Sequence, residues 1–294
     1  MAKKKRLRFR FGLMTLLSAV TVFCVWLGYQ AEQTRCQREA VESLSRSNAI
    51  HVVYDYEADP DSGENDKPGV PQWLLNIFGK DFFYDVEFVS ANYFFHPADE
   101  ARLARLSDLP KLKRFELVAS SLSNRGLESI ASATSLEELV FVQVEFADEP
   151  GLSTLSHLEN LQTLTVFKCD GITLAELAQF DSSPIQELSL HWFADEPGAL
   201  ASGIQGFGSL QRLSLNSISL GHADFAALAK LPSLTRLELD NFSCSEEALR
   251  ILNESPSLET IHVRTNVSNQ TAGEARAKQQ RLRELLPDKN VTFY

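Results

Sequence analysis

One short apolar phrase recurs at a nearly constant interval along the chain, and this repetition limits the folds that the chain can adopt. Successive copies of the phrase start 24 or 25 residues apart. The seven copies are Leu112-x-x-Phe115-x-Leu117, Leu136-x-x-Leu139-x-Phe141, Leu161-x-x-Leu164-x-Val166, Ile185-x-x-Leu188-x-Leu190, Leu210-x-x-Leu213-x-Leu215, Leu234-x-x-Leu237-x-Leu239 and Leu258-x-x-Ile261-x-Val263. A looser copy, Phe83-x-x-Val86-x-Phe88, starts 29 residues before the first of them. A period of this length predicts a solenoid.

The spacing inside the phrase predicts the structure of each repeat. Its last two apolar residues are two positions apart, so they point to the same side of a short strand. Such a strand cannot bury that side alone, but it can do so beside the matching strand of the next repeat. The second half of each repeat has helical spacing, as in Thr173-Leu-Ala-Glu176, which has the pattern of a capping box. We therefore predict an α/β horseshoe with parallel strands on the concave face and helices on the convex face.

Two repeats share the string Phe-Ala-Asp-Glu-Pro-Gly, at residues 146–151 and 193–198. Acidic residues before a proline suit the start of a helix, where the backbone dipoles favour negative charge. A metal-binding or substrate-binding role is the alternative interpretation. Helix starts account for the strings without it.

The N-terminal part of the chain has the pattern of a membrane anchor. Six Lys and Arg residues lie within residues 1–10, and residues 11–31 contain no charged side chain. About 20 apolar residues suffice to span a bilayer, and Trp26 and Tyr29 stand near the far end, where interfacial aromatic residues are common. The basic flank predicts a cytoplasmic N-terminus. A cleaved signal peptide is the alternative, although the bulky residues after Cys24 make a poor cleavage site.

The regions around the repeats are expected to close the two ends of the solenoid. We expect a cytoplasmic basic tail (residues 1–10), a transmembrane helix (11–31), a stalk (32–48), an aromatic N-terminal cap (49–82), the repeats (83–270) and a C-terminal cap (271–294). The first cap should contain a strand at residues 50–56, a loop rich in Pro and Gly, and a short helix at residues 73–78. The second should contain a helix that opens at Thr271, carries Leu282, Leu285 and Leu286 on one side and stops at Pro287, followed by a final strand.

Composition excludes some classes of partner. Once the six N-terminal cations are removed from the 28 Lys and Arg residues, 22 remain against 39 Asp and Glu, so the rest of the chain carries a formal charge of −17. Nucleic acid is a poor partner for so acidic a protein. Cys169 and Cys244 lie three repeats apart, about 15 Å at strand spacing, which is too far for a disulfide.

No catalytic constellation stands out. The sequence contains no Gly-rich phosphate loop, no Cys-x-x-Cys pair, no His-Glu-x-x-His motif and no Gly-x-Ser-x-Gly motif, and its six histidines are scattered through different elements. We therefore expect no catalytic, cofactor-binding or metal-binding site and no small-molecule ligand.

The outward positions of the strands are the candidate binding surface. One predicted row consists of Glu116, Val140, Thr165, Ser189, Ser214, Glu238 and His262. The next consists of Val118, Val142, Phe167, His191, Asn216, Asp240 and Arg264. The second row begins apolar, and its stripe of Val118, Val142 and Phe167, flanked by Arg114 and Glu138, is the best candidate contact patch. The alternative is ordinary β-propensity at half-exposed positions.

The candidate protein-binding residues are therefore Arg114, Glu116, Val118, Glu138, Val140, Val142, Thr165, Phe167, His191, Asn216, Asp240 and Arg264.

The repeats resemble the leucine-rich-repeat superfamily, nearest to its helix-backed, ribonuclease-inhibitor-like branch. With the basic N-terminus and the single apolar span, the chain looks like bacterial membrane-anchored leucine-rich-repeat proteins. The superfamily usually has Asn or Cys where the chain turns after each strand. Here that position is occupied by Ser120, Val144, Cys169, Phe193, Ile218, Phe242 and Asn266, so only Ser120, Cys169 and Asn266 could bond to the turning backbone.

The resemblance implies a non-catalytic module that binds proteins, because most members of the superfamily do so. We expect a single-pass membrane protein that presents its repeats on the periplasmic or extracellular side and binds or scaffolds another protein. A structural envelope element without a specific ligand is the second interpretation, and a hydrolase that uses acidic residues near the repeat loops is the third. Fold alone does not decide between them.

Overall fold

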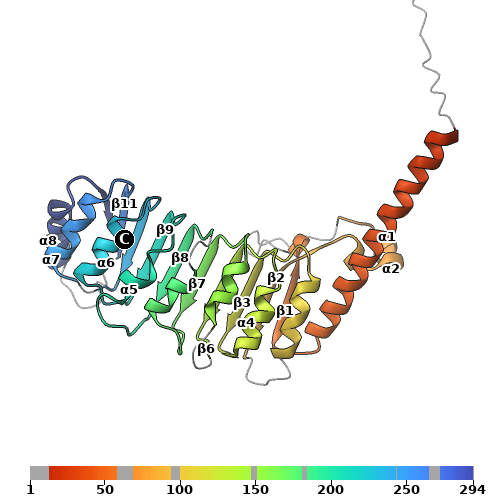
Figure 1. Cartoon of the computed structure of the whole chain (residues 1–294), viewed down its shortest axis with the longest axis horizontal. Helices are drawn as coiled ribbons and strands as arrows, with labels where there is room; N and C mark the ends of the chain where they lie inside the picture. The colour runs from red at the N-terminus through yellow and green to blue at the C-terminus, as the bar shows by residue number, and fades with distance from the viewer. Residues whose placement is uncertain are drawn as a thin grey trace, which may run out of the picture.

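The computed structural model describes residues 13–57, 69–93, 100–146, 151–180, 184–242, 244–264 and 272–293. Figure 1 shows a row of strands side by side, with one long helix projecting from the N-terminal end of the row. The basic tail, the loop at residues 58–68, the acids of the first Phe-Ala-Asp-Glu-Pro-Gly string, Asn266 and Thr271 lie outside the described residues.

The main sheet has ten strands in the order β1-β2-β3-β5-β7-β8-β9-β10-β11-β12. β1 pairs with β2 antiparallel, and every other neighbouring pair in this sheet is parallel. The strands are β1 (Ile50–Tyr54), β2 (Val86–Asn92), β3 (Arg114–Val118), β5 (Glu138–Val142), β7 (Thr163–Phe167), β8 (Glu187–His191), β9 (Arg212–Asn216), β10 (Arg236–Asp240), β11 (Thr260–Arg264) and β12 (Asn290–Phe293). A second sheet pairs β4 (Ser121–Leu122) with β6 (Glu145–Phe146).

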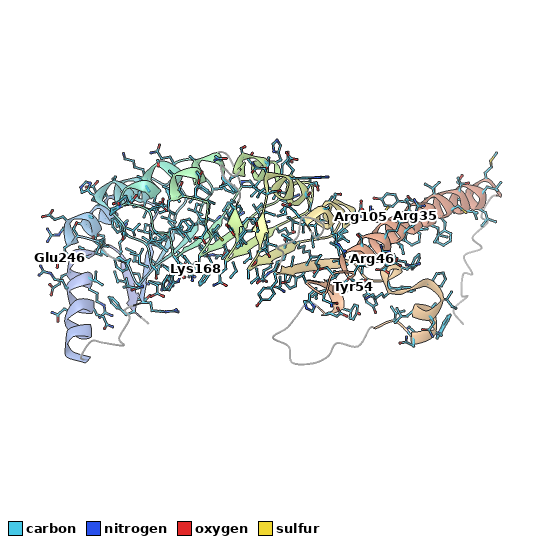
Figure 2. All side chains as sticks on the ribbon, turned by 90° about the horizontal axis from the view of Figure 1, so that it is seen from below. Arg35, Arg46, Tyr54, Arg105, Lys168 and Glu246 are labelled. Atoms are coloured by element: carbon cyan, nitrogen blue, oxygen red, sulfur yellow. The ribbon has the colours of Figure 1, made fainter. Side chains whose placement is uncertain are left out.

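Short helices cover one face of the sheet, as predicted, and the other face carries no helix in the described repeats (Figure 2). About half of the covering segments are 3-10 rather than α, because a repeat of 24 or 25 residues leaves room for only one or two turns after the strand and its bends. The α-helices are α4 (Asn124–Ala131), α5 (Ala199–Gly203), α6 (His222–Ala229) and α7 (Glu246–Arg250). The 3-10 segments are η3 (Ala101–Asp108), η4 (Leu152–His157), η5 (Leu174–Phe180) and η6 (Ile251–Glu254).

The core is the predicted ladder of apolar side chains. The first residue of each of the seven phrases is at most 3 % exposed, and the two strand residues that face inward are at most 1 % exposed. Strand pairing brings them into register, for example Leu164 beside Leu188 and Leu188 beside Leu213. The inward side chains of each repeat are therefore buried mainly by those of the preceding and following repeats.

The first repeat is in a different register from the one predicted. Val89 pairs with Phe115 and Ala91 with Leu117, so the first phrase is Val86-x-x-Val89-x-Ala91 and not Phe83-x-x-Val86-x-Phe88. The predicted register placed the large aromatic residues Phe83 and Phe88 at apolar positions of the phrase. Phe83 instead follows the 3-10 turn η2 (Lys80–Phe82), and the small Ala91 occupies the inward position.

Seven consecutive strands of the sheet, β2 to β10, end in the same turn. The residue after β2, β3, β5, β7, β8, β9 and β10 has a positive φ, between 46° and 64°, although none of these residues is glycine. Its backbone N–H can then donate to a carbonyl of the next repeat, as from Lys168 to His191 at 2.9 Å. One residue later, Ser120 and Cys169 donate to the carbonyls of Val118 and Phe167 respectively, which confirms the polar role predicted for both.

The N-terminal end of the solenoid is closed partly by the long helix α1 (Leu13–Leu44). Its last turns are buried, with Gln37 3 % exposed and Ala40 and Leu44 fully covered. The Gln37 amide donates to the carbonyl oxygen of Tyr84 at 2.8 Å, and the Tyr54 hydroxyl donates to Asp81 at 2.7 Å. The segment expected to be a stalk is therefore packed into the cap, because its apolar residues recur at helical spacing and find the open end of the ladder.

The predicted strand and short helix of this cap are β1 and α2 (Gln72–Phe78), which is followed by η2; a further 3-10 turn, η1 (Asp55–Glu57), follows β1. At the other end, α8 (Ala272–Leu285) buries Leu282 and Leu285, and Leu286 follows it into the core. The Lys289 ammonium donates to the carbonyls of Ser255 and Leu258, at 2.6 and 2.9 Å. The four cysteines are free thiols, so Cys169 and Cys244 are not joined.

Neighbouring repeats also cap one another's helices. Asp224, on α6, is completely buried, and its carboxylate accepts from the backbone N–H groups of Gly198, Ala201 and Gly221 at 2.7 to 2.8 Å. Gly198 and Ala201 belong to the start of α5 in the preceding repeat. One carboxylate thus satisfies the open N–H groups of two helices.

We expect Asp224→Ala to lower the free energy of unfolding by about 3 kcal/mol, because it removes the buried carboxylate that accepts from three partly buried N–H groups. Urea denaturation followed by circular dichroism measures the change. Asp195→Ala is the matched control. Asp195 accepts a single bond, from the Leu174 N–H at 3.3 Å, and is half-buried, so its loss should cost no more than about 1 kcal/mol. Equal costs for the two variants would contradict the capping role of Asp224.

Candidate protein-binding face

The pairing of the strands places the candidate residues in three parallel rows on the helix-free face. Row A holds the first residue of each strand: Arg114, Glu138, Thr163, Glu187, Arg212, Arg236 and Thr260. Row B holds the third: Glu116, Val140, Thr165, Ser189, Ser214, Glu238 and His262. Row C holds the fifth: Val118, Val142, Phe167, His191, Asn216, Asp240 and Arg264. Every candidate residue thus lies on this face, in the row expected from the sequence.

The apolar start of row C is less open than expected. Val118, Val142 and Phe167 are half-buried, and the Phe167 ring lies 5.5 Å from the His191 ring. Val140, in row B, is only 7 % exposed and is therefore a poor contact residue. Its side chain lies between those of Glu116 and Thr165 on the paired strands. The accessible apolar surface is thus the row C stripe of Val118, Val142 and Phe167, to which Val140 of row B adds little.

Row A is an edge of ion pairs. The Arg114 guanidinium lies 3.4 Å from Glu138 on the next strand and 3.7 Å from Glu116 on its own strand. Arg212 pairs with Glu187 on the preceding strand. These groups are partly exposed, so each pair contributes little to stability. Their effect is to hold charged side chains in fixed positions beside row B.

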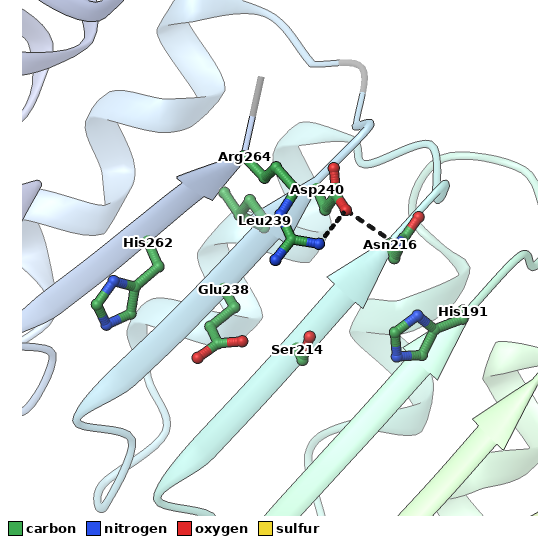
Figure 3. A pocket seen from close by; sticks show the side chains of 8 residues that line it. All are labelled: His191, Ser214, Asn216, Glu238, Leu239, Asp240, His262 and Arg264. Atoms are coloured by element: carbon green, nitrogen blue, oxygen red, sulfur yellow. Dashed lines mark hydrogen bonds and ion pairs between the residues drawn. The ribbon is translucent and has the colours of Figure 1, made fainter. Parts of the chain in front are cut away.

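An open hollow of ≈ 370 Å³ lies over β8 to β11 and is lined mainly by polar side chains (Figure 3). Asp240 connects two of them: its carboxylate accepts from the Asn216 amide at 3.1 Å and lies 3.6 Å from the Arg264 guanidinium. The lining residues are His191, Ser214, Asn216, Glu238, Leu239, Asp240, His262 and Arg264. Four of these were candidates. Ser214, Glu238 and His262 belong to row B, which the repeat register identifies, but they were not among the chosen residues.

Burial sets the charge of His191. Desolvation lowers the pKa of the imidazole below its usual value near 6.5, and the attraction of Asp240 opposes this only in part. The ring is therefore neutral at neutral pH, and it can offer both a donor and an acceptor nitrogen to a partner. On the far side of the hollow, His262 forms a hydrogen bond through Nδ1 with the Thr292 hydroxyl.

Hydrogen-bonding groups and apolar surface lie side by side on this face. Among the described residues, no group of three or more His, Cys, Asp or Glu side chains could hold a metal ion. Among the residues that line the hollow, Asp240 contacts Asn216 and Arg264, as Figure 3 shows. An apolar stripe beside a polar hollow offers a partner both buried contact area and oriented hydrogen-bonding groups.

Sequence reasoning missed a fourth row. Row D holds the turn residues that follow Asn92 of β2 and the row C residues from Val118 to Asp240: Tyr93, Ala119, Gln143, Lys168, Trp192, Ser217 and Asn241. Tyr93 is 71 % and Trp192 55 % exposed, which makes them the most exposed aromatic side chains at the rim of the repeats. The sequence does place Tyr93 and Trp192 one residue beyond a strand position that aligns with row C. Strand alternation alone, however, does not predict where the side chain of a turn residue points.

Residues 174–291 match the family model described as "FBD-associated F-box protein At5g56370, LRR repeats". No curated protein matches the chain.

Among solved structures, similar chains include an internalin (inlF) from Listeria monocytogenes, at 19 % identity and a TM-score of 0.43 over 63 % of this chain and 48 % of that one. An internalin C2 (inlC2) from the same organism aligns at 19 % identity and a TM-score of 0.39, over 65 % of this chain and 84 % of that one. The chain thus spans about half the length of the first internalin.

We expect Asp240→Asn to lower the pKa of His191 further, because the variant removes the charge that favours the imidazolium. The His191 ring shifts in two-dimensional NMR spectra, followed against pH, measure this pKa. Glu116→Gln, three strands away in row B, is the control and should leave the titration unchanged.

The depressed pKa also makes the stability of the fold depend on pH. The unfolded chain takes up the proton first as the pH falls below about 6.5, so the contribution of His191 to stability is present above that pH and is lost as the pH falls towards the folded-state pKa. A His191 pKa at or above the usual value would contradict this description of the hollow.

Proposed function

Because the chain is a leucine-rich-repeat protein, whose fold is one used for protein interaction, we propose that it binds another protein through its helix-free face and does so as a non-catalytic, membrane-anchored module. The observation that carries the proposal is the continuous register of rows A to C. It presents side chains from seven strands on one preformed surface. A rigid surface loses little conformational entropy when a partner binds.

The binding surface that we propose has three parts. The half-buried stripe of Val118, Val142 and Phe167 supplies apolar area, and the hollow around Asp240 supplies hydrogen-bonding groups. Trp192, in row D, follows His191 directly and lies at the boundary between the two. An exposed tryptophan between an apolar stripe and a polar pocket is the type of residue that contributes most to protein interfaces.

We also propose the domain organisation expected from the sequence, with one change. The basic tail (1–10) is cytoplasmic, residues 11–31 span the membrane, and the repeats (83–270) and C-terminal cap (271–294) lie on the other side. The change is that residues 34–44, at the end of α1, join residues 49–82 in the N-terminal cap. Support comes from the burial of Ala40 and Leu44, and from the lack of charged residues in 11–31.

The retained anchor is preferred to a cleaved signal peptide for a structural reason. Among the described residues, one helix is long and apolar enough to cross a membrane, and it is the helix that ends in the fold. Cleavage near residues 24–31 would cut this helix just before the turns that cover the open end of the ladder. Leu27 and Ala31 line a groove together with Phe78 and Phe82, which supports a chain in which span and cap remain joined.

A photoreactive amino acid placed on each face in turn tests the binding proposal in intact cells. Replacement of Phe167 or Trp192 should give a cross-link to one discrete protein, whereas replacement of Glu128, an exposed residue on α4 of the helical face, should give none. Mass spectrometry of the adduct identifies the partner.

With that partner purified, we expect Trp192→Ala to weaken binding at least about tenfold, the effect expected of a central aromatic contact. Glu128→Ala should leave the Kd unchanged. Cross-links from the helical face alone, or none from either face, would contradict the proposal. The second outcome would favour a structural element without a specific ligand.

A further inference from the structure

The short helix α2 carries an apolar surface that the other described residues leave largely uncovered. Trp73 is 61 %, Ile77 65 % and Phe78 45 % exposed. Trp73 and Ile77 are four residues apart and therefore lie on the same side of the helix. The helix contains no charged residue, and none of its side chains is fully buried. In water this surface is unfavourable, so a covering environment is expected.

α2 lies beside α1, and both views of the molecule agree on this (Figures 1 and 2). A mostly apolar groove of ≈ 390 Å³ lies between α1 and the segment formed by α2 and η2. It is lined by Leu27, Ala31, Thr34, Arg35, Arg38, Phe78 and Phe82. The Arg38 guanidinium holds them together: it donates to the Phe78 carbonyl oxygen at 3.0 Å and lies 3.6 Å from the Asp81 carboxylate. The Phe78 ring packs against the Phe82 ring at 5.2 Å.

The position of this groove along α1 indicates its depth relative to the proposed membrane span. Leu27 and Ala31 are in the last turns of the uncharged run at residues 11–31, whereas Arg35 and Arg38 follow its end. At 1.5 Å per residue, about 20 residues span a hydrocarbon core of about 30 Å. The groove therefore lies at the level at which the span leaves the bilayer. Trp26 and Tyr29, which are 52 % and 63 % exposed, lie at the same level.

We propose that α2 is an interfacial helix, which inserts Trp73, Ile77 and Phe78 into the boundary between acyl chains and headgroups of the leaflet from which α1 emerges. The inference rests on the membrane anchor of the proposed function and adds a second contact with the same bilayer. With Trp26 and Tyr29, the inserted residues would form a belt of aromatic side chains, which suits this depth of a membrane.

Lipid fits this surface better than a protein partner does. The apolar face of α2 is continuous, through Phe78, with Leu27 and Ala31 of the span, so whatever covers α2 must also reach the edge of the bilayer. No charge on α2 is available to orient a protein partner.

Contact with the bilayer through both α1 and α2 also affects the orientation of the repeat domain. A single helix leaves the repeat domain free to tilt, whereas α1 and α2 together fix how the helix-free face is presented.

Fluorescence of the full chain tests the proposal, because tryptophan occurs only at positions 26, 73 and 192. Three variants each keep one tryptophan and replace the other two by phenylalanine. They are reconstituted into phosphatidylcholine–phosphatidylglycerol vesicles that carry bromine either near the headgroup or deep in the acyl chain. Trp73 should be quenched at least about twofold by shallow bromine and less by deep bromine. Trp192, on the repeat rim, is the matched control and should not be quenched.

The variant that keeps Trp26 separates this inference from the anchor on which it rests. Quenching of Trp26 without quenching of Trp73 leaves the anchor intact and overturns the interfacial helix. Lack of quenching at Trp26 overturns the anchor itself. A Trp73 emission that is blue-shifted but unquenched means that protein, either a second copy or a partner, covers α2, and this also overturns the proposal. Adding Ile77→Glu to the Trp73 variant should abolish the shallow quenching, whereas adding it to the Trp26 variant should change nothing.

Discussion

The structure depends on parallel pairing between strands that are too short to exist alone. Each repeat strand after the first has five residues, of which two face inward, so the only apolar surface available to cover Leu188 and Leu190 is that of β7 and β9 and the helices behind them. The same hydrogen bonds that align the inward residues also align the outward ones. Rows A to C are thus a consequence of the core, and the proposed binding surface is preformed because the strands cannot slip in register without exposing leucine.

A ladder of this kind has two open ends, and the chain covers them differently. The C-terminal end is closed by a helix and a final strand, with Lys289 satisfying two carbonyl groups there. The N-terminal end is closed by β1, by aromatic residues and by the last turns of α1. One helix therefore contributes to the core through Leu44 and, in the proposed arrangement, spans the bilayer. In that arrangement the repeat domain is attached to the membrane without a flexible linker.

The repeat period predicted the ladder, the parallel sheet and the membership of rows B and C, because all three follow from alternation and a constant interval. It misplaced the first repeat, where Ala91 occupies a position that hydrophobicity alone assigns to a larger residue. It also missed contacts that require three-dimensional proximity. Asp224 looks like an ordinary surface acid in the sequence, and Gly203 like an ordinary glycine, yet a side chain at Gly203 would clash with the Leu174 carbonyl oxygen. The exposure of Trp192 and the burial of Val140 depend on turn geometry and on neighbours, which periodicity does not contain.

The most direct test of the ladder is hydrogen exchange, resolved to single amides, at the turn residues of row D. Lys168, Trp192 and Ser217 follow the ends of their strands, and the Trp192 side chain is 55 % exposed, but each backbone N–H donates to the next repeat at 2.9 to 3.0 Å. These amides should therefore exchange as slowly as those inside the strands, at intervals of 24 or 25 residues. If they exchange at the rate of an open loop, the repeats are not joined as described and the binding face is not preformed.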